Sequence, residues 1–269
     1  MRRLVAIVLF LVAAPSMVTA QTVRLYAAGS LKAALSEVAR AFEAATAGVL
    51  VELEFAPSGL LRERIEKGEP AHVFASADVG HPTRLAQSGR AKTTVAVFAR
   101  NRLCALVRSG LPVTPASLLE AMLDGSVRLG TSTPQADPSG DYAFALFAKA
   151  EKIKTGARAA LEARALQLTG GPTSEKAPAG RNPYAWVMAS GKADIFLTYC
   201  TNAVLAQQEV ASLQIVQVPA ELSVGADYGM IVLNDAPPPA DALARFILGD
   251  AGQAILAKWG FGAGDGVRN

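Results

Sequence analysis

Short β-rich apolar runs alternate with amphipathic helical patterns along this chain, and this alternation constrains the fold more than any other feature. Residues 23–27 and 49–55 have the composition of strands, and residues 31–45 between them carry apolar side chains at helical spacing. A strand, a helix and a second strand in this order predict a parallel pair joined by a crossover helix. The predicted class is α/β, with a mostly parallel sheet covered on both faces.

The same alternation continues to the end of the chain. Further strands are expected over residues 72–75, 103–107, 127–130, 194–199, 214–218 and 228–233, and further helices over residues 60–67, 82–88, 115–123, 142–152, 184–189 and 240–259, the last interrupted at Gly249.

These elements form two groups with no Gly/Ser linker between them. We expect two α/β lobes: lobe I from residues 21–100 and 225–269, and lobe II from residues 101–224. The chain is expected to cross between the lobes through ordered segments near residues 97–102 and 219–227.

The N-terminus has the pattern of a secretory signal peptide over residues 1–20. Arg2 and Arg3 precede an apolar run over residues 4–14, and small residues lead to Ala20. The run is shorter than the roughly 20 apolar residues that a membrane-spanning helix needs. We expect cleavage after Ala20, and because position 21 is Gln rather than Cys, no lipid anchor is indicated. No later stretch is apolar enough to enter a membrane.

Composition excludes several classes of function. The full chain has 26 Lys and Arg against 23 Asp and Glu, a formal net charge of +3 without a clustered basic run, so a nucleic-acid-binding surface is not indicated. With 2 Cys and 2 His in all, zinc, haem and iron–sulfur sites lack their usual ligands, and no metal cation or cofactor is expected.

Cys104 and Cys200 belong to a chain predicted to leave the cytoplasm, where disulfides persist. A bridge closing a loop of about a hundred residues would stabilise the fold by about 4 to 5 kcal/mol on the chain-entropy argument. Two small buried residues on separate strands fit the same sequence, and both interpretations stay open.

Enzyme motifs are not found. The nucleophile elbow, the Ser-x-x-Lys pair, the zinc-protease helix and the phosphate-binding loops all fail to match. A Ser-His-Asp site would have to use His72 or His81, and both lie in positions that favour a structural role.

Small hydroxyl residues recur instead where a strand is followed by a helix. Ser30 follows Gly29, and Ser58 and Ser139 each stand between Pro and Gly. A helix start has unpaired N–H groups and a partial positive charge, and a small side chain lets an anion approach them. N-capping alone explains most such serines, but three of them in an exported two-lobed chain favour an anion site.

Five motifs in order resemble those of the periplasmic molybdate-binding proteins, the substrate-binding components of molybdate ABC importers. They are Ala27-Ala28-Gly29-Ser30-Leu31, Phe55-Ala56-Pro57-Ser58-Gly59-Leu60, the segment from Pro70 to Asp78, Pro138-Ser139-Gly140-Asp141-Tyr142 and Tyr199-Cys200-Thr201-Asn202-Ala203. The resemblance covers residues 23–261. It implies the two-lobed periplasmic binding protein fold (type II-like), with a hinge and a ligand cleft between the lobes.

The resemblance also implies a site. By position, Ser30 and Ser58 match anion-binding serines of the first lobe, Ser139 matches a residue whose backbone N–H binds the ligand, and Tyr199 matches a tyrosine whose hydroxyl completes the second-lobe half. Neutral donors of this kind suit a desolvated tetrahedral dianion, because hydrogen bonds to a charged group contribute roughly 1.5 to 3 kcal/mol each.

Three residues depart from the family pattern. Arg181 stands near a position where the family has a backbone donor, and its guanidinium either pairs with the ligand or is solvated. Asp141 would repel a dianion if it faced the ligand, and His72 replaces a residue that is usually Asp.

The sequence therefore predicts a periplasmic, monomeric solute-binding protein that is not an enzyme. Its expected partners are a small oxyanion, molybdate or tungstate first, and an ABC transporter permease. The alternatives are a binder of sulfate, phosphate or a carboxylate that uses Arg181, and, from another class, a periplasmic serine hydrolase.

Overall fold

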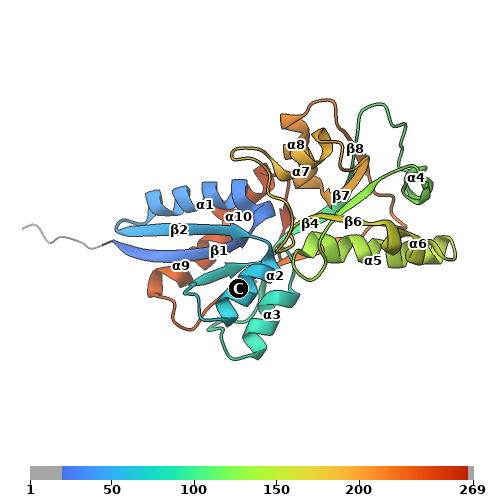
Figure 1. The fold of residues 1–269 in the computed structure, drawn as a ribbon. Coiled ribbons are helices and arrows are strands. Elements are labelled where there is room, and N and C mark those ends of the chain that lie inside the picture. The colour runs from blue at the N-terminus through green and yellow to red at the C-terminus, as the bar shows by residue number, and fades with distance from the viewer. Residues whose placement is uncertain (1–19, 266–269) are drawn as a thin grey trace, which may run out of the picture.

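The computed structural model describes residues 20–265, so the predicted signal peptide lies outside the described residues except for Ala20. Helices and strands gather in two groups joined by a narrower waist (Figure 1). The strands form one mixed ten-stranded sheet in the order β2-β1-β3-β9-β4-β7-β5-β6, with β8 and β10 also paired to β4. The α/β class and the two-lobed binding-protein fold are confirmed.

The first part of the chain, to the crossing strand, contains β1 (Gln21–Ala28), the short 3-10 helix η1 (Gly29–Leu31), α1 (Lys32–Ala45), β2 (Val49–Ala56), α2 (Ser58–Glu66), β3 (Val73–Ala75), α3 (Gly80–Gln87) and β4 (Ala96–Val107). The middle contains α4 (Leu118–Leu123), β5 (Leu129–Ser132), α5 (Pro138–Ile153), α6 (Ala157–Arg164), β6 (Leu166–Thr169), α7 (Pro183–Ala189), β7 (Ile195–Tyr199), α8 (Cys200–Glu209) and β8 (Gln214–Gln217). The last part contains β9 (Gly225–Val232), α9 (Pro238–Leu248), α10 (Asp250–Lys258) and β10 (Gly262–Ala263).

Strand β4 is the element that both groups share. Its first half pairs antiparallel with β9, from Ala96 opposite Met230 to Arg102 opposite Gly225. Its second half, from Leu103 to Val107, pairs antiparallel with β7. The first expected crossing segment, residues 97–102, is thus part of a continuous strand, and the second ends in β9.

The expectation of a mostly parallel sheet is wrong in one respect. Parallel pairing holds within each group, where β1 joins β2 and β3, and β5 joins β6 and β7. The strands that carry the chain between the groups run in opposite directions, so the pairings of β4 and β9 are antiparallel. The sheet is therefore mixed.

Besides the two-residue strand β10, three elements were not anticipated: α6, β6 and α8. Helix α8 buries only small or polar residues, among them Thr201, Asn202 and Ala206, and helix α6 buries only Ala157 and Leu161. Strand β6 is four residues long and largely open to solvent. None of the three carries the apolar periodicity on which a prediction from sequence depends.

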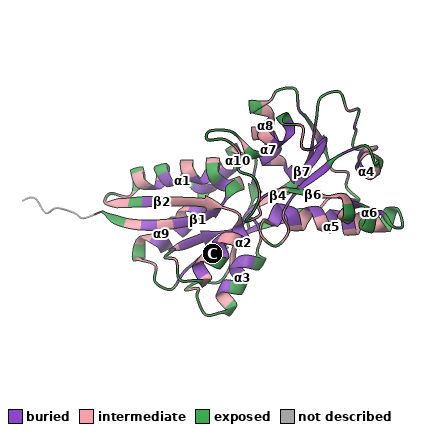
Figure 2. Ribbon diagram, viewed as in Figure 1, coloured by how far each residue is buried: buried purple, intermediate pink, exposed green. Residues whose placement is uncertain are grey.

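Burial follows the strands, and the helices present an exposed outer face (Figure 2). The principal core includes Leu25, Phe98, Phe147 and Tyr199, all with at most 1% of their surface exposed. No helix within the described residues is long and apolar enough to span a membrane.

Cys104 and Cys200 are joined by a disulfide across 96 residues. The bond ties β4 to the first residue of α8, directly after Tyr199. Of the two interpretations left open by the sequence, the structure has the bridged one.

Asp194, a buried residue just before β7, is predicted to stabilise the folded state of lobe II. Its carboxylate accepts hydrogen bonds from Arg108 Nε at 2.7 Å and from Arg128 N and Nε at 2.9 Å, and these groups hold its pKa well below its usual range. Asp194→Asn should lower the free energy of unfolding by about 2 kcal/mol at neutral pH, as expected for lost charge-assisted hydrogen bonds. Urea denaturation measures the change.

The pH dependence has a definite sign. Because the pKa of Asp194 is lower in the folded than in the unfolded chain, its contribution is present above the ordinary pKa of about 4 and is lost as pH falls through the folded value. The difference between the two proteins should shrink in acid. Asp235→Asn, at an exposed position, is the control, and an equal effect of both variants at neutral pH would contradict the assignment.

Candidate functional site

Four of the five predicted site residues lie where strands end at the junction between the two lobes. Ser30 follows β1 in η1, Ser58 is the first residue of α2 after β2, and Tyr199 is the last residue of β7. Ser139 is the second residue of α5, the helix that follows β5. Because β1 and β2 are parallel and in register, their carboxyl ends present Ser30 and Ser58 at the same edge.

A continuous set of contacts links Ser58 in lobe I to Tyr199 in lobe II. Ser58 Oγ accepts a hydrogen bond from the N–H of Ala77 at 3.1 Å, and the Tyr199 hydroxyl donates to the carbonyl oxygen of Ala77 at 3.2 Å. Ser58 and Tyr199 have at most 1% of their surface exposed. Burial raises the pKa of Tyr199 well above its usual value, so the hydroxyl stays neutral and able to donate.

Gly59 brings the lobes into direct backbone contact. Its N–H donates to the carbonyl oxygen of Ala136 at 2.9 Å. A Cβ at position 59 would lie 2.2 Å from the carbonyl oxygen of Gln135 and 2.9 Å from Ala136 Cα. Only glycine fits at this position. Because the backbones of the two lobes touch here, the structure represents a closed arrangement of the lobes.

The backbone N–H of Ser139 has a partner within its own lobe. It donates to Asp137 Oδ1 at 3.0 Å, which makes Asp137 the N-cap of α5. Burial raises the pKa of Asp137 to about 6. The Ser139 hydroxyl is buried without a hydrogen-bond partner in the described part of the chain, so here the side chain, rather than the backbone group named by the resemblance, is the unused polar group.

Arg181 is not brought together with the other four residues. Its guanidinium pairs with Glu209 of α8, and 42% of its side chain is exposed. The first N–H groups of α7 that follow it, those of Tyr184 and Ala185, donate to the Asn182 side chain at 3.0 Å. The structure thus gives the charge of Arg181 a partner at the surface.

Tyr228 is a site residue that sequence reasoning missed. Its hydroxyl oxygen lies 3.1 Å from Ser30 Oγ, and its ring centroid lies 5.4 Å from that of Tyr199. Tyr142 of α5 extends this cluster, with its ring 6.2 Å from Tyr199. The one signal in the sequence was a polar aromatic residue in an otherwise apolar late strand, and its partner is 198 residues away.

Charged side chains close to the site nearly balance. Arg62 and His81 of lobe I are only 9% and 8% exposed, and the Arg62 Nε and His81 Nε2 atoms have no hydrogen-bond partner within residues 20–265. Burial lowers the pKa of His81 and raises the pKa of Asp141, so both shifts favour the neutral form. Asp78 accepts from the Ser76 hydroxyl at 2.7 Å. The hydrogen-bond donors gathered at this junction are therefore mainly neutral groups.

The two histidines differ in their hydrogen bonds. The ring of His72 accepts at Nδ1 from the N–H of Arg24 at 3.0 Å, whereas His81 donates to Asp78 at 3.1 Å through its backbone N–H. Asp141, whose charge was a concern, accepts from the N–H of Gln135 at 2.9 Å. Across the described residues, no group of three His, Cys, Asp or Glu side chains is placed to hold a metal ion.

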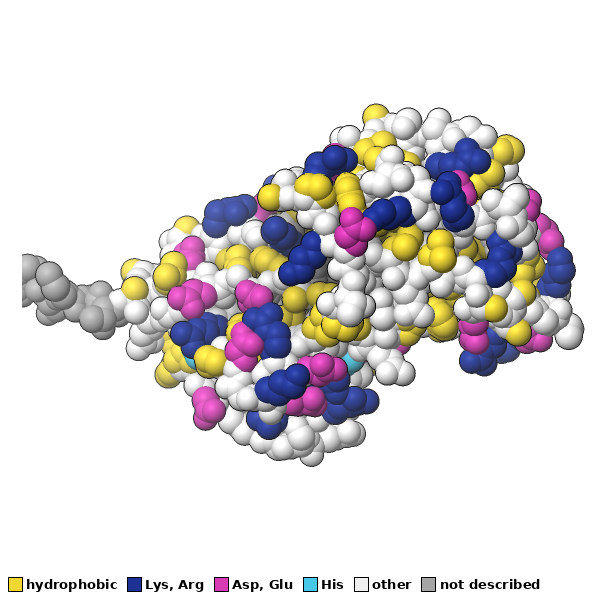
Figure 3. All heavy atoms as spheres, in the orientation of Figure 1, with side chains coloured by type: hydrophobic (Ala, Val, Ile, Leu, Met, Phe, Trp, Pro, Cys, Tyr) yellow, Lys and Arg dark blue, Asp and Glu magenta, His cyan; other side chains and the backbone are white. Residues whose placement is uncertain are grey.

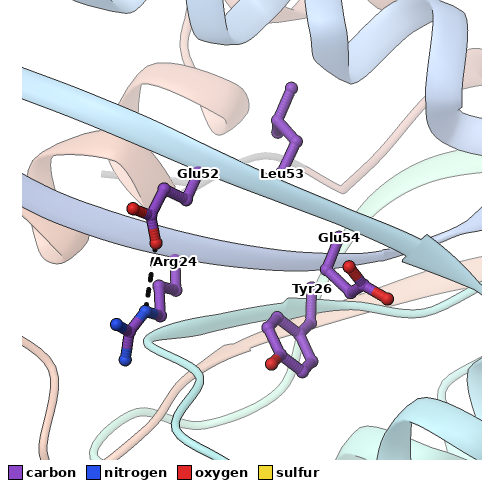
Figure 4. Close-up of a pocket in the computed structure, with 5 residues that line it drawn as sticks. All are labelled: Arg24, Tyr26, Glu52, Leu53 and Glu54. Atoms are coloured by element: carbon purple, nitrogen blue, oxygen red, sulfur yellow. Dashed lines mark hydrogen bonds and ion pairs between the residues drawn. The ribbon is translucent and has the colours of Figure 1, made fainter.

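A hollow on the surface of lobe I offers less to an anion. A hollow beside β1 and β2 is lined by Arg24, Tyr26, Glu52, Leu53 and Glu54 (Figure 4). The charged side chains of this hollow are already paired, because Arg24 Nε lies 3.1 Å from Glu52 and Glu54 lies 2.7 Å from Arg64. The Tyr26 hydroxyl also has a partner, since it donates to Glu69 at 2.6 Å. Positive and negative side chains are interspersed over the face shown in Figure 3.

Comparison with known sequences connects the chain to one family. Residues 23–262 match the profile of the family described as bacterial extracellular solute-binding protein. An uncharacterised protein of Pasteurella multocida, PM1146, is 38% identical over 179 residues, which cover 66% of this chain and 73% of the relative. Molybdate-binding protein ModA of Mycobacterium tuberculosis is 26% identical over 246 residues, covering 90% and 85%.

Solved structures with the same fold have different printed ligands. The periplasmic molybdate-binding protein of Azotobacter vinelandii superposes with a TM-score of 0.69 at 20% identity, over 89% of this chain and 98% of that one. The sulfate-binding protein SubI of M. tuberculosis superposes with a TM-score of 0.73 at 18% identity, over 89% and 86%. At these identities the structures establish the shared fold and nothing finer.

Gly59→Ala tests whether the lobe contact is the closed state. The added methyl group collides with the backbone at residues 135–136, while alanine suits the helical position itself by about 1 kcal/mol. We expect a larger radius of gyration by small-angle X-ray scattering under conditions in which the wild type is closed, with no loss of thermal stability. Gly125→Ala, where an added Cβ meets nothing within 4 Å, is the control. A variant as compact as the wild type would contradict the interpretation.

Proposed function

Because this chain belongs to the bacterial extracellular solute-binding proteins, we propose that it captures a small tetrahedral oxyanion outside the cytoplasm and delivers it to the permease of an ABC importer. Molybdate and tungstate are the preferred candidate ligands. The proposed location is the periplasm after removal of the signal peptide, and the proposed working form is a monomer.

The observation that carries the proposal is the convergence of neutral hydroxyl groups at the lobe junction. Ser58 and Tyr199 meet the same residue, Ala77, from opposite lobes, and Ser30 approaches Tyr228 on β9. Ser139 adds a buried hydroxyl without a partner in the described residues. These hydroxyls can surround one small ligand once the lobes separate and close again.

Such a set of donors suits an oxyanion. Each oxygen of a tetrahedral dianion that leaves water needs a directed donor, and a hydrogen bond to a charged acceptor contributes roughly 1.5 to 3 kcal/mol. A ligand that touches both lobes favours the closed arrangement by its differential affinity for it. The contact of Gly59 with Ala136 would then form around the ligand.

The choice of molybdate first rests on the resemblance of the motifs and on the ModA relative, which aligns over 90% of this chain. Sulfate is the second candidate, since a sulfate-binding protein shares the fold over 89% of this chain. A version of this candidate that uses Arg181 for charge is less supported, because Arg181 pairs with Glu209.

We propose a binding protein rather than an enzyme, without a resident cofactor. A serine hydrolase needs a base beside its nucleophile. In the structure Ser58 Oγ meets a backbone N–H and Ser30 Oγ meets a tyrosine hydroxyl. The His72 ring accepts a backbone N–H, and no hydrogen bond joins the ring of either histidine to Ser30, Ser58 or Ser139 within the described residues, so the geometry supports binding.

Isothermal titration of the purified mature protein, stripped of ligand, tests the proposal. Molybdate and tungstate should bind one to one, and Ser30→Ala and Ser58→Ala should each weaken binding about 10-fold to 100-fold, as expected for one lost hydrogen bond to a charged ligand. Arg181→Gln should leave the affinity unchanged.

Ser212→Ala, at an exposed position, is the matched control for the serine variants. Unchanged affinity in both Ser30→Ala and Ser58→Ala would contradict the site. Loss of binding in Arg181→Gln would favour the charged-site alternative, and silence with molybdate, tungstate, sulfate and phosphate would reject the oxyanion proposal.

A further inference from the structure

A buried chain of hydrogen bonds runs from the site serine of lobe I, through both crossing strands, into lobe II. Ser30 Oγ lies 3.1 Å from the hydroxyl oxygen of Tyr228 on β9. Asn101 on β4 donates from Nδ2 to that same oxygen at 3.3 Å and to Thr201 Oγ1 on α8 at 2.9 Å. Tyr228, Asn101 and Thr201 are 0%, 9% and 7% exposed.

The orientation of the Asn101 amide is fixed by its other end. Its Oδ1 accepts a hydrogen bond from the N–H of Arg102 at 2.9 Å. An amide oxygen cannot donate, so the NH₂ group must face Thr201 and Tyr228. Asn101 therefore supplies one proton to each of them.

This orientation leaves the hydroxyl proton of Tyr228 available for another partner. Because the Tyr228 oxygen accepts from Asn101, its own proton is free to point at Ser30 Oγ. Burial raises the pKa of Tyr228 far above neutrality, so this proton is retained. When this proton is directed at Ser30, Ser30 Oγ accepts from Tyr228, and the serine proton remains for a ligand.

The packing around Tyr228 holds its hydroxyl in place. Its ring lies 5.4 Å from Tyr199 and 5.5 Å from Phe261 between ring centroids, and 6.3 Å from Phe98. The packing therefore holds the Tyr228 hydroxyl beside Asn101 of β4 and Ser30 of lobe I, and its ring beside Tyr199 of lobe II.

We propose that Tyr228 and Asn101 are positioning residues that orient Ser30 as a hydrogen-bond donor toward an anion and, through Thr201, couple Ser30 itself to the closed arrangement of the lobes. The first half of this statement rests on the proposed function. The second half concerns the lobes alone and holds for any ligand.

The ligand arm of the test uses molybdate and Tyr228→Phe, which keeps the ring and removes only the hydroxyl. We expect molybdate affinity to fall about tenfold, the scale of one lost hydrogen bond. In a Ser30→Ala background, Tyr228→Phe should have little further effect, because both changes act on one group. Tyr26→Phe is the matched control, since it removes another buried tyrosine hydroxyl with a single partner, Glu69.

The closure arm needs no ligand. Hydrogen exchange at the Gly59 N–H, which donates across the lobes to Ala136, reports opening directly. We expect exchange at Gly59 to be several-fold faster in Tyr228→Phe and in Thr201→Val than in Tyr26→Phe at equal thermal stability. A merely structural role would lower stability without this selective change.

The two arms separate the possible failures. If the wild type binds no oxyanion, the proposed function fails, and exchange at Gly59 still decides the coupling. If molybdate binds but Tyr228→Phe matches Tyr26→Phe in affinity, or adds its full effect to Ser30→Ala, the positioning role is overturned. If Gly59 exchanges no faster in either Tyr228→Phe or Thr201→Val, the coupling is overturned.

Discussion

The antiparallel pairing of β4 with β9 is the interaction on which the rest of this structure depends. Strand β4 begins in one lobe beside β9 and ends in the other beside β7 and β8. A strand shared in this way is an ordered hinge, because bending it changes the angle between the lobes without breaking either core. The disulfide between Cys104 and Cys200 fastens the second half of β4 to the end of the strand that carries Tyr199.

The proposed binding chemistry follows from this arrangement. Strands that converge on the crossing point deliver their ends, and the residues after them, to the lobe junction, where small side chains allow close approach. Gly59 is the clearest case, because its N–H reaches the Ala136 carbonyl only where a Cβ is absent. Hydroxyl groups then offer donors without a permanent charge, which suits a ligand that brings its own negative charge.

The sequence was sufficient for the fold class and for four residues that gather at the junction. Ser30, Ser58 and Ser139 were detectable because a hydroxyl residue beside glycine at a strand-to-helix step is a local pattern, and Tyr199 because its motif resembles that of the molybdate-binding family. Tyr228 was not detectable in this way, since its contact with Ser30 spans 198 residues. Helix α8 was missed because its buried face is made of small and polar side chains, and the direction of β4 and β9 depends on pairing that local patterns do not encode.

A crystal structure of the protein grown with molybdate, with anomalous data collected at the molybdenum edge, tests the central claim most directly. The account predicts a single strong peak at the lobe junction, with the molybdate oxygens around it within hydrogen-bond distance of the Ser30 and Ser58 hydroxyls and close to Tyr199. A peak beside Arg181, or a junction that stays closed and empty while molybdate binds elsewhere, would contradict it.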